Sequence, residues 1–327
     1  MKFTTYKTFE GEKPRFGFIV EGYIIDIIRL SIWINENNKD ASFLSIPTTL
    51  KLALNKWNEH YDKLINLERI ISNLDHSTLE VNGKSISINL NDAHLLPPVP
   101  NPTTFRDFYA FEQHVKAARK MRGLDMNPDW YKIPIFYFSN ITSLYGHKED
   151  LPYPIGTKEL DFELELAIII ANGGKNIDKN DANKFIAGYT ILNDWSARDL
   201  QREEMQMNLG PAKGKDFANS FGPYMVTPDE LINNWENDKI NLRMTCYLND
   251  KLISDGNTND LYHSFPEMIQ RASMNVELKA GDYIGSGTVG TGCILELRPE
   301  STGGWLKKGD TIRLEIDNLG VLENTII

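Results

Sequence analysis

The sequence has 327 residues, of which 41% are hydrophobic and 24% are charged, close to the averages of soluble globular proteins. The 35 Lys and Arg residues are outnumbered by 45 Asp and Glu residues, which gives a formal net charge of −10. A surface of this sign repels phosphate backbones and anionic lipid, so nucleic acids and membranes are excluded as expected partners. The longest apolar run, Leu166–Ala171, is far shorter than the roughly 20 residues of a membrane span.

The cysteines and the first residues indicate a reducing compartment. Cys246 and Cys293 are the only cysteines and lie far apart, so they form neither a disulfide framework nor a CxxC pair. The first residues lack the apolar stretch of a secretory signal. We therefore expect a cytoplasmic protein.

A proline-rich segment divides the chain. Four prolines within residues 97–102 cannot continue a helix or a central strand. We therefore expect an N-terminal β-rich domain over 1–96, a linker over 97–104 and a second domain over 105–327. In the first domain the residue patterns predict strands over Lys2–Tyr6, Arg15–Val20 and Tyr23–Ile28, followed by a helix over 47–74.

The second domain is rich in strand-like runs. Helices are expected over Phe105–Arg122 and Tyr262–Ala272. Runs of β-branched and aromatic residues between Gly and Asn turns predict strands over Asp161–Ile170, Ala187–Asn193, Ile240–Leu248, Asp282–Gly285, Cys293–Leu297 and Thr311–Ile316. Because strands outnumber helices without a regular βαβ alternation, the sequence predicts a β-rich α+β fold.

Two glycine-rich segments do not qualify as nucleotide-binding motifs. Residues 285–290 fit GxGxxG, but a strand-like run follows them where the dinucleotide motif requires a helix. Residues 210–215 resemble a phosphate-binding loop but are one residue short and are followed by Asp216 in place of Ser or Thr. No nucleotide cofactor is expected.

Acidic residues alternate along one predicted strand. The two-residue period of a strand places Asp161, Glu163 and Glu165 on one face, and the residues that follow are wholly apolar. Neighbouring carboxylates at the entrance to a core repel each other and are costly to bury. A bound cation would relieve both costs, while a solvated strand face or a lysine partner is the plain alternative.

Two further segments carry candidate functional residues. Asp194, Arg198 and Gln201 have the spacing of one helix face, although an N-cap aspartate with an ion pair explains them as well. Asp107 and His114 are nearly two helical turns apart and would share a face of the predicted helix. A lone histidine is, however, more often structural than catalytic.

Five sequence blocks in a fixed order resemble the fumarylacetoacetate hydrolase superfamily, and most closely its fumarylacetoacetase members. They are DFYAFEQH (107–114), DFELELA (161–167), NDWSARDLQ (193–201), LGPAKGKDF (209–217) and GSGTVGTGCILEL (285–297). The resemblance implies a small SH3-like β-barrel as the N-terminal domain and a catalytic domain of rolled mixed β-sheets. It also implies a homodimer.

The resemblance assigns roles to thirteen residues. It implies that a divalent cation is held by Asp107, Glu163, Glu165 and Asp194. His114 matches the general base, and Glu296 matches the carboxylate that orients it. The positions near substrate are Tyr109, Arg122, Tyr137, Arg198, Gln201, Lys215 and Thr288, of which Arg122 is one residue out of register. A ligand set of carboxylates without cysteine favours Mg²⁺, with Mn²⁺ or Ca²⁺ as the alternatives, over Zn²⁺.

The implied activity is the hydrolysis of a carbon–carbon bond in a β-diketo acid, fumarylacetoacetate or a related acylpyruvate, by water that His114 activates. One alternative is a 2-oxo acid decarboxylase, hydratase, dehydratase or isomerase that works through an enolate on the same scaffold. A non-catalytic metal-binding protein is the other alternative.

Overall fold

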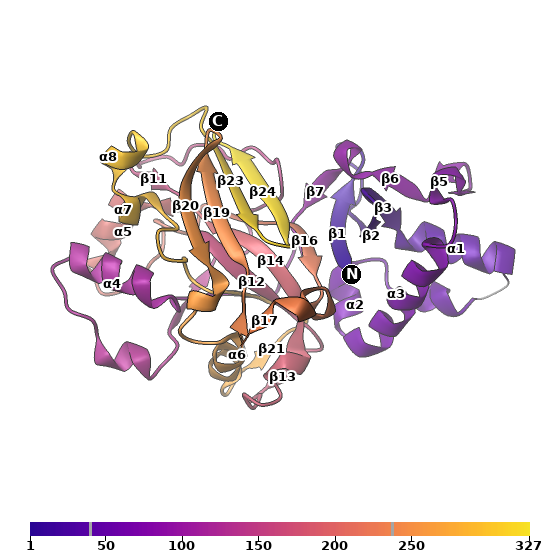
Figure 1. The fold of residues 1–327 in the computed structure, drawn as a ribbon, viewed down its shortest axis with the longest axis horizontal. Coiled ribbons are helices and arrows are strands. Elements are labelled where there is room, and N and C mark those ends of the chain that lie inside the picture. The colour runs from indigo at the N-terminus through magenta and orange to yellow at the C-terminus, as the bar shows by residue number, and fades with distance from the viewer. Residues whose placement is uncertain (39–40, 237–238) are drawn as a thin grey trace.

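The computed structural model describes residues 1–38, 41–236 and 239–327, which build a β-rich mixed α/β fold around one large mixed sheet (Figure 1). The strands of this sheet are, in spatial order, β6 (Ser87–Asn89), β3 (Tyr23–Asp26), β2 (Arg15–Val20), β1 (Lys2–Lys7), β16 (Asn219–Val226), β14 (Ile186–Asp194), β12 (Leu164–Ile170), β22 (Tyr283–Gly285), β8 (Phe105–Phe108) and β9 (Phe136–Ser139), with β10 (Leu144–Tyr145) beside β16 and β7 (His94–Leu96) beside β1.

A second, antiparallel sheet and several short elements complete the fold. The second sheet has the order β20 (Lys251–Asn257), β19 (Arg243–Leu248), β23 (Thr311–Ile316) and β24 (Gly320–Thr325). Two-stranded pairs are β4 (Glu80–Val81) with β5 (Lys84–Ser85), β11 (Leu160–Asp161) with β15 (Ser196–Ala197), β13 (Gly174–Lys175) with β21 (Glu277–Leu278), and β17 (Trp235–Glu236) with β18 (Lys239–Ile240). The helices are α1 (Ile27–Asn38), α2 (Leu50–Leu54), α3 (Trp57–Ile71), α4 (Glu112–Met121), α5 (Arg198–Met205), α6 (Phe265–Ser273), α7 (Ile294–Leu297) and α8 (Pro299–Thr302).

Strand β12 is buried on both faces, which explains its continuous apolar run. Leu166 and Ile168 point into the hydrophobic cluster shared with the second sheet. Ala167 and Ile169 point into the opposite cluster, which holds the apolar faces of α1, α2 and α3. A central strand with a core on each side needs apolar residues at every position, so Glu165 at its start is enclosed as well.

The N-terminal strands continue the large sheet. Residues Lys2 and Phe3 of β1 pair with β16, and residues 5–7 of β1 pair with β7. The separate SH3-like barrel that the resemblance implied is therefore not confirmed. The segment 97–104 contains no helix or strand, as its prolines predict, and the domain division at this segment remains a prediction.

Several predicted elements differ from the structure. Residues 105–108 form the buried strand β8 between β22 and β9, so only the second half of the predicted helix 105–122 is helical. The predicted strand 293–297 is the short helix α7. The predicted helix 47–74 is two helices, α2 and α3, separated by residues 55 and 56. Among the described residues, no helix combines the length and the apolar content needed to cross a bilayer.

Candidate active site

Three buried carboxylates meet where three strands of the large sheet lie close together. Asp107 belongs to β8, Glu165 to β12 and Asp194 to the end of β14, and an oxygen of each lies within 4.8 Å of the others. In the sheet, β22 is the one strand between β8 and β12, and β14 pairs directly with β12. The structure therefore brings together three of the four predicted cation ligands, which we name the carboxylate cluster.

Two glycines allow the backbone to approach the carboxylate cluster. Gly285 lies opposite Asp107 in the strand pair, and a Cβ atom at Gly285 would be 2.3 Å from an Asp107 carboxylate oxygen. Gly287 has a backbone φ of 79°, which residues other than glycine rarely adopt. Its N–H donates to Glu165 at 3.0 Å and to Asp107 at 3.3 Å. The GxGxxG-like segment thus packs against the carboxylate cluster and donates hydrogen bonds to it.

The carboxylate cluster suits a hard divalent cation. Asp194 Oδ1 is buried and has no hydrogen-bond partner within the part of the chain that the structure describes. Burial, followed by repulsion from Asp194, raises the pKa of Asp107. Burial, followed by repulsion from Asp107 and Asp194, raises the pKa of Glu165. A divalent cation would stabilise the ionised forms of these crowded carboxylates, and an all-oxygen donor set favours Mg²⁺, Mn²⁺ or Ca²⁺.

Glu163, the fourth predicted ligand, is bound by cations of the protein itself. Arg198 Nη2 donates to Glu163 at 2.7 Å, and Lys215 Nζ donates to both Glu163 and Asp194. Burial opposes the ionisation of Glu163, yet Lys215 and Arg198 lower its pKa well below the usual value. Lys215 therefore links an ionised Glu163 to the carboxylate cluster. On the other side, Tyr137 donates its hydroxyl to Asp194 at 2.7 Å.

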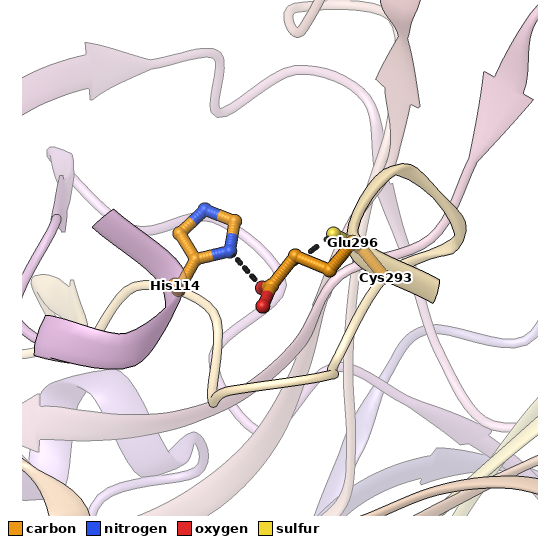
Figure 2. A group of neighbouring side chains, drawn as sticks. All are labelled: His114, Cys293 and Glu296. Atoms are coloured by element: carbon orange, nitrogen blue, oxygen red, sulfur yellow. Dashed lines mark hydrogen bonds and ion pairs between the residues drawn. The ribbon is translucent and has the colours of Figure 1, made fainter. Parts of the chain in front are cut away.

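His114 and Glu296 form a hydrogen-bonded pair. His114 Nδ1 bonds to Glu296 Oε1 (Figure 2), while the second carboxylate oxygen accepts the N–H of Thr291 at 3.1 Å. The Cys293 thiol lies 3.9 Å from Glu296, and burial raises the pKa of this thiol, which favours its neutral form. Since Nδ1 faces Glu296, Nε2 is the nitrogen left to accept a proton.

One cavity of about 820 Å³ is lined by every predicted site residue except Glu296. Glu296 is hydrogen-bonded to His114, which does line the cavity. The substrate-side positions in this wall are Tyr109, Arg122, Tyr137, Arg198, Gln201, Lys215 and Thr288. Burial raises the pKa of the Tyr109 hydroxyl to about 12, so it is a hydrogen-bond donor at neutral pH. A second cavity, of about 770 Å³ beside α6, contains none of the predicted residues.

Three of the local geometries predicted for these residues are wrong. Asp107 lies on β8 and His114 on α4, so they share no helix face. Helix α5 begins at Arg198, so Asp194 is the end of a strand and not an N-cap. The acidic strand is interrupted after Asp161, and β12 begins only at Leu164. Pairing between strands that are distant in sequence assembles the site, and spacing along one element does not.

Apolar side chains form part of the cavity wall. Met121 ends α4, Met205 ends α5, and Leu124 and Ile135 lie in the segments beside them. Leu124, Ile135 and Met205 are each 41–50% exposed. Exposed apolar side chains that gather around one opening indicate contact with a ligand or a partner. Of these four residues, the sequence indicated only Met205, which closes the mostly polar helix RDLQREEM.

Comparison with known proteins identifies the family. A family model described as fumarylacetoacetate (FAA) hydrolase C-terminal matches residues 103–327. The chain belongs to the fumarylacetoacetate hydrolase family. The resemblance inferred from the five sequence blocks is therefore confirmed, and the matched region contains every residue of the candidate site.

Curated relatives of the chain include an oxaloacetate tautomerase and a protein named for its domain. The mitochondrial oxaloacetate tautomerase FAHD2A of Homo sapiens is 34% identical over 198 residues, which are 60% of this chain and 60% of that protein. The match thus spans about 60% of the length of this relative. A fumarylacetoacetate hydrolase domain-containing protein 2 homolog of Dictyostelium discoideum is 28% identical over 333 residues, which are 100% of this chain and 97% of that protein.

Solved structures of the family share the fold over the whole chain. The maleylpyruvate hydrolase of Sphingobium sp. SYK-6 has a TM-score of 0.68 at 22% identity, with 100% of this chain and 99% of that chain covered. The 5-carboxymethyl-2-hydroxymuconate delta-isomerase of Mycobacterium smegmatis has a TM-score of 0.65 at 20% identity, with the same coverage. At these identities the similarity shows the fold, which hosts hydrolases and isomerases alike.

Proposed function

We propose that this protein is a metal-dependent hydrolase that cleaves a carbon–carbon bond in an acylpyruvate or a related β-diketo acid. The observation that carries the proposal is the His114–Glu296 pair at the wall of the cavity that holds the carboxylate cluster. Hydrolysis needs a base that removes a proton from water, and a histidine held by a carboxylate serves that purpose. Because the chain is 34% identical to an oxaloacetate tautomerase, tautomerisation is the second reaction to be tested.

In the proposal, Asp107, Glu165 and Asp194 hold the cation, with Mg²⁺ the first expectation and Glu163 the predicted fourth ligand. When bound, a divalent cation would polarise the two carbonyl oxygens of a 1,3-dicarbonyl group. A solved maleylpyruvate hydrolase of the same fold, with a TM-score of 0.67, is described in complex with manganese (II) and pyruvate. That description supports a divalent cation without selecting the metal of this chain.

The residues of the chain supply the remaining steps of the proposal. His114 Nε2 accepts a proton from water, and Glu296 stabilises the imidazolium that results. The water oxygen bonds to the acyl carbon, and the bond from that carbon to the methylene breaks. The electron pair stays on the pyruvate enolate, which takes up a proton and leaves as pyruvate beside the carboxylic acid. Arg198, Gln201 and Lys215 hold the carboxylate and the developing oxyanion.

A second candidate is the interconversion of the keto and enol forms of a 2-oxo acid. The similarity to oxaloacetate tautomerase FAHD2A favours it. This reaction moves a proton between carbon and oxygen and adds no water, so His114 would serve it without pyruvate release. The two candidates therefore differ in their products.

Product analysis with a matched histidine control tests both candidates. We expect the Mg²⁺- or Mn²⁺-loaded protein to release pyruvate from acylpyruvates, and His114→Ala to lower kcat by roughly 10²–10⁴-fold. His94→Ala is the control, because His94 is 46% exposed and pairs with Glu149 outside the cavity. Pyruvate release at the normal rate by His114→Ala would contradict the mechanism. Loss of the oxaloacetate enol signal without any pyruvate release would support the second candidate instead.

A further inference from the structure

The Asp161 carboxylate, which lies outside the carboxylate cluster, is fully buried and accepts four hydrogen bonds. Its Oδ1 accepts the N–H of Phe162 at 2.9 Å and that of Ile294 at 2.7 Å. Its Oδ2 accepts the N–H of Leu295 at 3.0 Å and Nε of Arg198 at 2.8 Å. The side chain is thus a junction between β11, α5 and α7.

One side of this junction leads to the proposed base. Ile294 and Leu295 are the first two residues of α7, and Glu296 is the third. The N–H groups at the start of a helix have no partners within the helix, and Asp161 accepts two of them here. Because α7 has only four residues, these bonds hold the same single turn that carries Glu296, the partner of His114.

The other side of the junction leads to the cationic wall of the cavity. Arg198 donates to Asp161 through Nε, to Glu163 through Nη2 at 2.7 Å and to Gln201 through Nη1 at 3.1 Å. Glu163 is linked through Lys215 to the carboxylate cluster. Asp161 therefore touches both the element that carries Glu296 and the arginine that faces the substrate.

We propose that Asp161 is a positioning residue that holds Glu296 in register with His114 and with the cationic wall. The inference rests on the proposed function, since it assigns Asp161 to the same proton transfer. The four groups that bond to the carboxylate are all donors, so a carboxylate satisfies them all. Each oxygen accepts two of these bonds, so an amide would turn its NH₂ group toward two of the donors and leave both unpaired.

A backbone substitution tests the contact without changing Asp161. Ile294 is the first residue of α7, where proline is favoured, and the preceding Cys293 has the extended conformation that proline requires (φ −151°, ψ 158°). Ile294→Pro removes the N–H that Asp161 accepts. Ile294→Ala keeps the N–H and loses similar packing, so it is the matched control. We expect kcat to be about 10-fold lower in the proline variant than in the alanine variant, with KM within 2-fold.

A double-mutant cycle separates a positioning role from a general loss of stability. We expect the difference between Ile294→Pro and Ile294→Ala to fall below 2-fold when Glu296→Gln is also present, because Asp161 then has no functional Glu296 to place. Asp161→Asn should behave in the same way, with a roughly 10–100-fold loss of kcat alone. The Ile294 pair decides the question if Asp161→Asn does not fold.

A spectroscopic signal gives a readout apart from activity. The Nδ1 proton of His114, hydrogen-bonded to Glu296, should give a downfield proton resonance in Ile294→Ala that shifts or disappears in Ile294→Pro. Equal loss of kcat with and without Glu296→Gln, or an unchanged resonance in the proline variant, would overturn the proposal. If Glu296→Gln by itself retains normal activity, the proposed function fails, and the two failures are thereby distinguished.

Discussion

Two glutamates that are two residues apart on one segment have opposite electrostatic surroundings. Lys215 and Arg198 both donate to Glu163, and they lower its pKa in spite of its burial. Glu165 accepts the N–H of Gly287 and the Thr288 hydroxyl, at 3.0 and 3.5 Å, and burial with carboxylate repulsion raises its pKa. A bound cation would therefore stabilise the ionised form of Glu165 more than that of Glu163.

This contrast predicts unequal effects on metal binding. Glu165→Gln should weaken Mn²⁺ binding about 100-fold or more, because it removes a ligand from the carboxylate cluster. Glu163→Gln should weaken it about 10-fold or less, because Lys215 and Arg198 already neutralise that carboxylate. Titration calorimetry of the metal-free protein with Mn²⁺ measures both variants. Equal losses in the two variants would contradict the distinction and support Glu163 as a ligand of equal weight.

At the scale of elements, short segments complete the site that the strands of the large sheet begin. The segment after β22 supplies Gly287, and α7 supplies Glu296. Another short segment, which precedes β11, is hydrogen-bonded to β24: His147 Nδ1 accepts the N–H of Glu323 at 3.2 Å. Burial, with a smaller repulsion from Lys148, lowers the pKa of His147 to about 4. His147 is thus neutral in the folded protein over most of the acidic range.

This neutral histidine predicts a pH-dependent stability. Since the folded pKa lies below the ordinary value of about 6.5, the unfolded chain binds the proton more readily, and stability falls as the pH drops from 6.5 toward 4. His147→Asn keeps an acceptor near Nδ1 but cannot titrate. Between pH 7 and pH 5 the wild type should lose about 1–2 kcal/mol more than this variant in urea unfolding. Parallel losses in both proteins would exclude His147 as the cause.

At the scale of the whole molecule, the two predicted domains share one sheet. The pairing of β1 with β16 and the burial of α1–α3 against β12 and β14 join residues 1–96 to the second part of the chain. The Met1 ammonium also bonds to Thr227 at 2.6 Å and to Glu230 at 2.9 Å. The homodimer implied by the resemblance remains a prediction, as does the cytoplasmic location.

The shared sheet predicts that the second domain depends on the first. A chain of residues 105–327 alone would expose an edge of β16 and the apolar cluster beneath α1–α3, so it should aggregate or lose its cooperative melting transition. Gel filtration and circular dichroism measure this outcome. Co-expression of residues 1–104 should restore a soluble complex. A monodisperse 105–327 fragment that melts like the full chain would support two independent domains.

The sequence by itself determined the family and the candidate residues of the site. Residue identities within the five blocks were sufficient for the family, because carboxylates, histidine and basic side chains in a fixed order can be read from the printed chain. The roles of cation ligand, base and orienting carboxylate belong to the proposal. The apolar run of β12 also predicted a doubly buried strand, since its side chains must suit a core on each face.

Only the tertiary structure decided how those residues meet. Asp107, Glu165 and Asp194 come from three strands that non-local pairing brings close together in the sheet, which no spacing within one element encodes. The same reason explains the errors at 105–108 and 293–297, where burial between strands and the bonds to Asp161 outweigh local residue preference. The contrast between Glu163 and Glu165 also depends on Lys215 and Arg198, which reach Glu163 from distant segments. Electrostatic partners of that kind exist only in the folded chain.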